Sequence, residues 1–185
     1  IWCSMSKLVE VKKVIADGTS ASVLLDGIDS NDIYYYTVVG ATHDGSALTD
    51  SVMFAHDGSA KVTTQYQGVS HGWRSDTTDS ILNMSASANM WQYAFGWSAL
   101  GTASTSITAP DQCHGDGYLF NFYNASLYSY VKGRFANAHN GSAVMLGGNT
   151  AAVNKHTAQH TGIMFEWTSG DNIAGEFTLF RLLES

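Results

Sequence analysis

Charged residues are scarce in this sequence. Asp, Glu, Lys and Arg make up 14% of the 185 residues, whereas they account for about a quarter of an average soluble domain. Acidic residues outnumber basic ones by 16 to 9, and no basic run exists. Because nucleic-acid binding depends mainly on Lys and Arg at phosphates, we expect no nucleic-acid partner. A surface covered by Ser, Thr, Asn, Gln and Gly favours a stable, assembled or extracellular protein over a cytosolic enzyme.

Long apolar runs are missing too. No stretch reaches the roughly 18 apolar residues that a membrane span needs, so we expect no membrane insertion. The N-terminus lacks the layout of a secretion signal, which predicts another route to its destination. Residues 1–6 are interpreted as a tail: either Met5 is the natural start, or a longer precursor was cut before Ile1.

Cysteine and proline are almost absent. Cys3 and Cys113 have no framework spacing, so we expect free thiols, with a disulfide between them as the alternative. With 18 Gly and only Pro110, turns must be formed mostly by Gly, Asn and Asp.

What the sequence does contain is period-two alternation of apolar residues, the pattern of strands with one face on a core. Ile163, Phe165 and Trp167 alternate with polar or less apolar neighbours, and after a turn at 169–172 the pattern resumes with Phe177 and Leu179 inward. We expect these segments to form a hairpin whose last strand lies inside a sheet, because a frayed strand would leave its backbone groups unpaired.

Similar segments recur along the chain. Residues 8–15 should place Val9, Val11 and Ile15 on one face, and a turn at Asp17-Gly18 predicts a hairpin with residues 21–25. Further expected strands include three dominated by aromatic residues: 33–40, 91–97 and 118–122. The aromatic residues at alternate positions of 91–97 are expected in the core.

The remaining segments are expected to separate strands. Residues 77–88 allow a helix, although they hold few apolar residues; residues 110–117 are predicted to form a loop, and Gly147-Gly148-Asn149 a turn. About ten to twelve short strands result. They predict an all-β fold, an antiparallel two-sheet β-sandwich that is jelly-roll-like, forming a single domain over residues 7–185.

No motif predicts catalysis. Gly68-Val69-Ser70-His71-Gly72 matches G-x-S-x-G, but no alternation of parallel strands and helices surrounds it, so we interpret it as a Gly/Ser loop. Glu is too scarce to assign the paired carboxylates of a glycosidase. We therefore predict no catalytic residues.

No metal or cofactor is expected either. His156 and His160 are spaced i, i+4, which brings ligands together on a helix but not on a strand. His114 and Asp116 stand alone, and residues 26–32 lack the calcium-loop pattern.

One short segment is a candidate for binding a ligand. His71, Trp73 and Arg74 lie close together, and an exposed Trp stacks on a sugar face while a guanidinium bonds its hydroxyls. The alternative is that Trp73 fills the end of the sandwich.

Two segments carry a resemblance to a known family. Gly162-Ile163-x-Phe165 leads into Ile173-x-Gly175-x-Phe177-x-Leu179, and upstream stands Gly117-Tyr118-Leu119-Phe120-Asn121-Phe122. With these, residues 7–183 loosely resemble small jelly-roll-like β-sandwich structural proteins of tailed bacteriophages, many of them marine, which end in a similar strand. The family pattern carries no catalytic residues.

The resemblance implies a non-enzymatic virion protein on the particle surface: a capsid decoration, a head fibre or a tail-appendage domain. Such a protein would be assembled in the host cytoplasm, with capsid or tail proteins as partners. Phe180 and Leu182 are apolar although they face away from the core, so we also expect copies of the chain to associate, as a trimer, over this end of the strand. The alternative function is a carbohydrate-binding module that recognises host surface polysaccharide; a polysaccharide-degrading enzyme ranks last.

Overall fold

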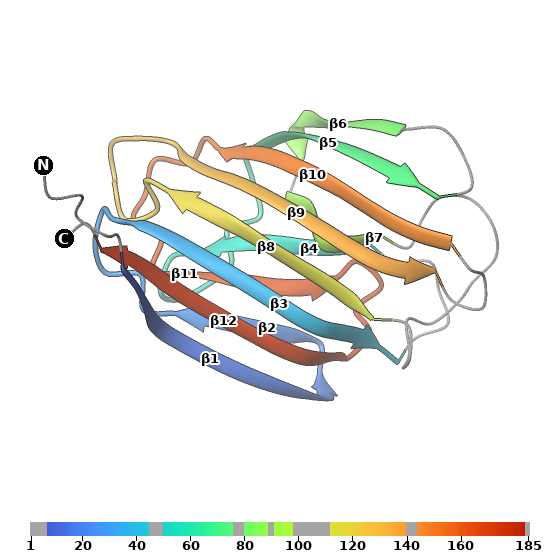
Figure 1. Ribbon diagram of the computed structural model, residues 1–185. Coiled ribbons are helices and arrows are strands. Elements are labelled where there is room, and N and C mark those ends of the chain that lie inside the picture. Colours follow the sequence, from blue (N-terminus) through green and yellow to red (C-terminus); the bar gives the residue numbers. More distant parts are fainter. Residues whose placement is uncertain are drawn as a thin grey trace, which may run out of the picture.

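The structure is a computed structural model that describes residues 7–44, 50–75, 80–88, 91–97, 112–139 and 144–183. Within these residues, twelve strands form two antiparallel sheets (Figure 1). The larger sheet contains, in spatial order, β1 (Lys7–Ser20), β12 (Ile173–Leu183), β3 (Ile33–His43), β8 (Cys113–Phe120), β9 (Ser129–His139), β10 (Val144–Asn154), β5 (Tyr66–Arg74) and β6 (Ser80–Ala88). The smaller sheet contains β2 (Ser22–Asp26), β11 (Gly162–Trp167), β4 (Asp50–His56) and β7 (Trp91–Trp97). The predicted all-β, two-sheet sandwich is confirmed.

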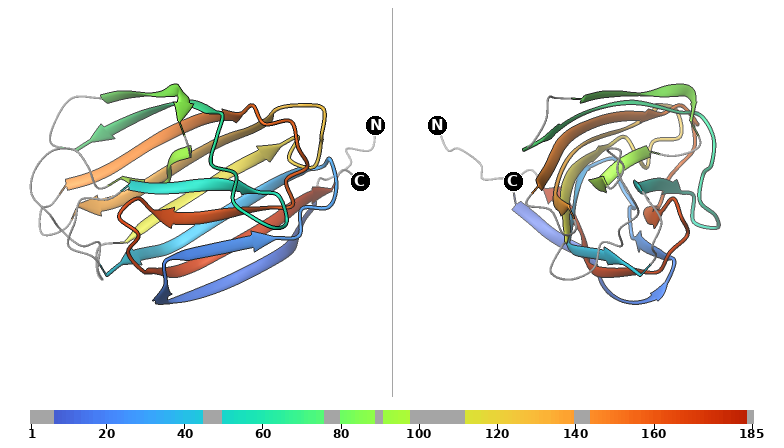
Figure 2. Two further views of the ribbon diagram at one scale, coloured as in Figure 1. Left: turned by 180° about the vertical axis from the view of Figure 1, so that it is seen from behind. Right: turned by 90° about the vertical axis from the view of Figure 1, so that its right-hand side faces the viewer.

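The order of strand pairing is that of a jelly roll. Strands β1 to β4 alternate between the two sheets and pair with β12, β11, β8 and β7, which return in reverse order. The chain is thus one long antiparallel ribbon wrapped on itself. Strands β5, β6, β9 and β10 widen the larger sheet, which curves around the smaller one (Figure 2).

Aromatic side chains join the two sheets. Phe165 of β11 lies 5.3 Å from Phe177 of β12 and 5.4 Å from Tyr36 of β3, measured between ring centroids, and all three are fully buried. The other residues that were predicted to face inward in β11 and β12, namely Ile163, Trp167 and Leu179, are buried as well. Period-two alternation therefore identified the core face of these strands correctly.

Two predicted hairpins are wrong. Strand β11 belongs to the smaller sheet and β12 to the larger, so the turn at 169–172 connects the sheets instead of two paired strands. The same holds for β1 and β2 on either side of Asp17-Gly18. Strand β12 does lie inside a sheet, between β1 and β3, as expected.

A β-bulge in β1 reverses the faces that were predicted for the later part of this strand. The pairing of β1 with β12 shifts register between Glu10 and Lys12, which moves every later side chain to the opposite face. Val14 and Ala16 therefore pack against the core, while Ile15 is 74% exposed. The prediction that Ile15 shares a face with Val11 is wrong for this reason.

Three segments predicted to lie between strands are strands themselves. Residues 80–88 form β6, so no helix forms there; β8 begins at Cys113, inside the predicted loop; and Gly147-Gly148-Asn149 lies in the middle of β10. The glycines of β8 and β9 make room for a ring: a Cβ at Gly117 would come within 2.7 Å of the Tyr36 ring, and one at Gly133 within 2.8 Å of its hydroxyl. Glycine inside a strand here marks close approach, not a turn.

Two predictions fall outside the described residues: the tail 1–6 with Cys3, and the burial of the aromatic side chains of β7. Cys113 carries a free, buried thiol, and burial raises its pKa. The described residues contain no helix, and hence none long and apolar enough to span a membrane.

Candidate functional site

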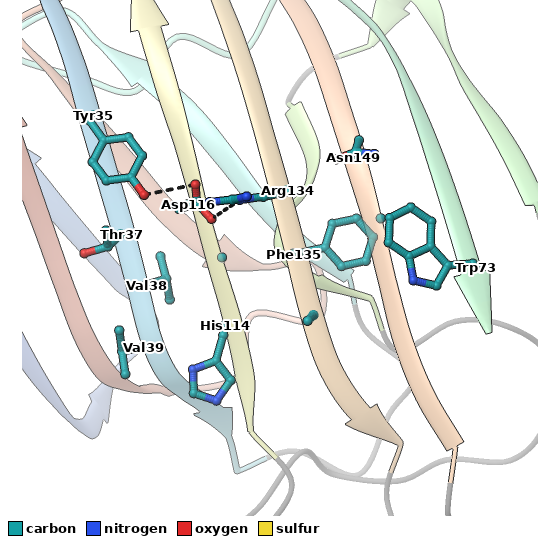
Figure 3. A pocket seen from close by; sticks show the side chains of 13 residues that line it. Tyr35, Thr37, Val38, Val39, Trp73, His114, Asp116, Arg134, Phe135 and Asn149 are labelled. Atoms are coloured by element: carbon teal, nitrogen blue, oxygen red, sulfur yellow. Dashed lines mark hydrogen bonds and ion pairs between the residues drawn. The ribbon is translucent and has the colours of Figure 1, made fainter. Parts of the chain in front are cut away.

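The outer face of the larger sheet, which points away from the smaller sheet, carries a groove of about 590 Å³. It runs across β3, β8, β9, β10 and β5 (Figure 3). Its prominent side chains are Tyr35, Trp73, His114, Asp116, Arg134 and Asn149. Because these strands run antiparallel with regular pairing over most of their length, the register decides which side chains meet there.

Aromatic side chains form one row of this face. The register aligns Phe180 of β12, Tyr35 of β3 and Tyr118 of β8. The Tyr35 ring centroid lies 4.9 Å from that of Tyr118 and 6.3 Å from that of Phe180. Tyr118 remains 43% exposed, so this row presents aromatic surface to solvent.

The neighbouring row is polar and rigidly bonded. Asp116 accepts a hydrogen bond from the Tyr35 hydroxyl (3.0 Å) and another from Nε of Arg134 (2.7 Å). Burial and the Asp116 hydrogen bond raise the pKa of Tyr35, and the hydrogen bond to Asp116 raises the pKa of Arg134. Asn149 of β10 is paired directly with Arg134 across the sheet. The row therefore offers fixed hydrogen-bond donors and acceptors beside the aromatic row.

Trp73 closes the groove on the β5 side. It is paired with Gly147 of β10, and a Cβ at that glycine would lie 2.8 Å from Nε1 of the indole. Since glycine leaves this space free, the indole lies against the strand, yet it is 43% exposed. His71 meets its ring in an edge-on contact at 6.1 Å. A flat aromatic platform at the side of a groove results.

The predicted ligand residues lie in a different structural element from the one expected. His71, Trp73 and Arg74 belong to strand β5, not to a loop. His71 and Trp73 point to the outer face, so Trp73 does not fill the end of the sandwich as the alternative proposed. The side chain of Arg74 lies outside the described part of the structure.

Sequence reasoning missed Tyr35, Asp116 and Arg134. Asp116 was placed in a loop, and no short motif links three residues from three strands. The one available signal was the run Tyr34-Tyr35-Tyr36, which predicts aromatic side chains on both faces of its strand. Tyr34 and Tyr36 are fully buried, while Tyr35 faces the groove.

Phe180 and Leu182 lie on this same outer face, as predicted. Both are partly buried; Phe180 contacts Tyr35, and Leu182 is paired with Leu8 and Ile33. They belong to β12, which lies five strand positions away from β5, the strand that carries Trp73. The two sets of predicted residues thus mark opposite sides of one face.

The other motifs have structural explanations. Gly68-Val69-Ser70-His71-Gly72 is extended strand, and its buried Ser70 donates to Thr150 Oγ1 at 3.0 Å, so no nucleophile elbow forms. In residues 26–32, Asp29 and Asp32 bind Arg181 at 3.3 and 2.5 Å. Among the described residues, no three His, Cys, Asp or Glu side chains are grouped as a metal site requires.

Comparison with models of known protein families gives no match, and no curated protein is significantly similar to this chain.

Proposed function

We propose that this protein is a non-enzymatic recognition domain on the surface of a tailed-phage particle, and that its outer groove binds a saccharide of the host surface. The observation that carries the proposal is the exposed Trp73 platform in the same groove as the hydrogen-bonded pair of Asp116 and Arg134. Sugars present apolar ring faces with hydroxyls around their edges. A site that combines an aromatic plane with convergent polar groups matches both features.

The composition of the groove argues against catalysis. Asp116 is the only carboxylate among the described residues that line it, and both of its oxygens accept hydrogen bonds. Glycoside hydrolysis ordinarily needs two carboxyl groups about 5 to 10 Å apart. The groove suits binding without bond cleavage.

The particle setting rests on the resemblance of β11, β12 and residues 117–122 to phage β-sandwich proteins. Jelly rolls occur in viral capsid proteins and in lectins, so the fold is compatible with both parts of the proposal, although a fold alone does not determine function. A surface with few charged residues and with glycine-containing turns suits a protein exposed on a particle. Capsid or tail proteins would then anchor it.

Replacing Trp73 by alanine should weaken saccharide binding about tenfold or more, because an exposed Trp that packs on its ligand typically contributes a large share of the binding energy. We suggest an array of bacterial capsular and O-antigen polysaccharides, with titration calorimetry on the best ligand. Tyr128→Ala is the matched control, since Tyr128 is also 43% exposed but lies outside the groove. If the native protein binds no glycan, or if both variants bind equally well, the groove is not a saccharide site.

Association with copies of itself is a second proposed role, favoured by the apolar side chains on the β12 side of the outer face. Leu8 is 48% exposed and adjoins Leu182, which itself remains partly accessible. We expect light scattering to give a trimer and Leu182→Glu to give monomers, because a charge buried at an interface is strongly unfavourable. A native monomer over the micromolar range would contradict this role and leave the saccharide proposal untouched.

A further inference from the structure

One lysine in the groove region has no charged partner. Lys12, Lys13 and Lys61 each form an ion pair with a carboxylate, at 3.0, 2.8 and 2.7 Å. Lys132, which is exposed on the outer face of β9, forms no ion pair with any described residue. Lys7 and Lys155 likewise form no ion pair with any described residue, but Lys132 is the one of the three that lines a hollow shared with Arg134.

The lysine borders a small hollow that continues the groove. This hollow, of about 330 Å³, is lined by Asp116, Tyr118, Lys132, Gly133, Arg134 and Asn149. Lys132 and Arg134 are two residues apart on β9, so they project from the same face about 7 Å apart. Two cationic groups and one amide thus surround a space that an exposed tyrosine ring borders.

The charges of the hollow do not cancel. Arg134 is neutralised by Asp116 through Nε, and its side chain is 71% exposed. The described lining therefore carries two positive charges and one negative charge. A neutral sugar gains no specific interaction from the extra positive charge, whereas an oxyanion forms charge-assisted hydrogen bonds with Lys and Arg.

We propose that the groove selects acidic saccharides, and that a carboxylate or sulfate substituent binds between Lys132 and Arg134 while the sugar ring packs on Tyr118. This inference rests on the proposed saccharide function and specifies its ligand class. Asn149, across from Arg134, is placed to bond a hydroxyl of the same residue.

The test uses three polymers that share one glucan backbone: dextran, carboxymethyl-dextran and dextran sulfate. The full chain should bind one or both acidic polymers about tenfold more tightly than dextran. Lys132→Gln should remove most of that preference. The two acidic polymers distinguish a carboxylate from a sulfate ligand. Because salt screens exposed charges, the preference for acidic polymers should shrink when the salt concentration is raised about tenfold, from roughly 0.05 to 0.5 M.

Lys7→Gln is the matched control, because it removes the same charge from β1, at the far edge of the sheet. Equal losses in both variants would indicate attraction by net charge and overturn the inference, as would equal binding of all three polymers or binding of none. The glycan array and Trp73→Ala decide the saccharide function separately. If only neutral glycans on the array bind, the saccharide function stands and the proposed class of acidic ligands is rejected.

Discussion

Replacing Phe165 by alanine should lower the free energy of unfolding by about 4 kcal/mol, the middle of the range for buried aromatic residues. Phe165 is the ring through which β11 of the smaller sheet contacts Tyr36 and Phe177 of the larger one. Its removal takes away both ring contacts and leaves a cavity between two sheets that are each held by their own hydrogen bonds, so the gap cannot close easily.

Urea denaturation followed by far-ultraviolet circular dichroism measures this loss. Ile15→Ala is the control: Ile15 is 74% exposed, so its truncation should change stability by no more than about 0.5 kcal/mol. A loss below about 1 kcal/mol for Phe165→Ala would show that the ring does not join the sheets as described.

Alternation of apolar residues predicted which side of each strand faces the core, but not the sheet to which the strand belongs. Phe165 and Phe177 were both placed inward correctly, yet as members of one hairpin. In a jelly roll both sheets face the same core, so strands of either sheet show the same period. The short turn at 169–172 is compatible with a hairpin and with a crossing between sheets, and local residues do not distinguish them.

Glycine was the other source of error. Gly117 and Gly147 were assigned to a loop and a turn because glycine often supplies special backbone angles there. In this fold they serve a different purpose: Gly117 makes room for Tyr36 on the inside, and Gly147 for Trp73 on the outside. A glycine in a turn and a glycine that makes room for a ring both depend on the absence of a side chain. Only the residue on the neighbouring strand shows which of the two a given glycine is.

The candidate site could be predicted in part. Trp73 was identified because an aromatic residue among Gly, His and Arg stands out locally. Its companions were not, because Tyr35 and Asp116 are 81 residues apart in the sequence and meet only through the register of β3 with β8. That register depends on the bulges and on the packing of the inner face, neither of which alternation encodes.

His160 should make the protein lose stability as the pH falls from 6.5 to about 4. Its side chain is fully buried in the connection before β11, and neither ring nitrogen has a hydrogen-bond partner among the described residues. Burial, and secondarily the nearby His156 ring 6.1 Å away, lower the pKa of His160 from 6.5 to about 4. Nearby Asp57 and the backbone of His156 act on the pKa in the opposite direction, each by less than burial does.

The sign follows from proton linkage. Between pH 6.5 and 4 the unfolded chain binds a proton at this histidine that the folded chain does not, so acidification favours unfolding, by up to about 3 kcal/mol. Above pH 6.5 the contribution is fully present, and below pH 4 this group causes no further loss. Burial also lowers the pKa of His43, which adds to the loss in the same direction. The pKa of Asp57 is held at about 2 by the amides of Ala60 and Ser59, so its own contribution is lost only at lower pH.

Urea denaturation of the native chain and of His160→Phe at intervals between pH 7.5 and 4.5 isolates the effect. The variant removes the titrating group, so its stability should fall less steeply with acidification, whatever its stability at pH 7.5. Ile15→Ala, which leaves every titrating group in place, should keep the slope of the native protein. Parallel curves for the native chain and His160→Phe would mean that the folded protein accepts a proton at His160 as readily as the unfolded chain does. A partner for that imidazolium would then have to exist, and Asp57 is the carboxylate close enough to interact with it.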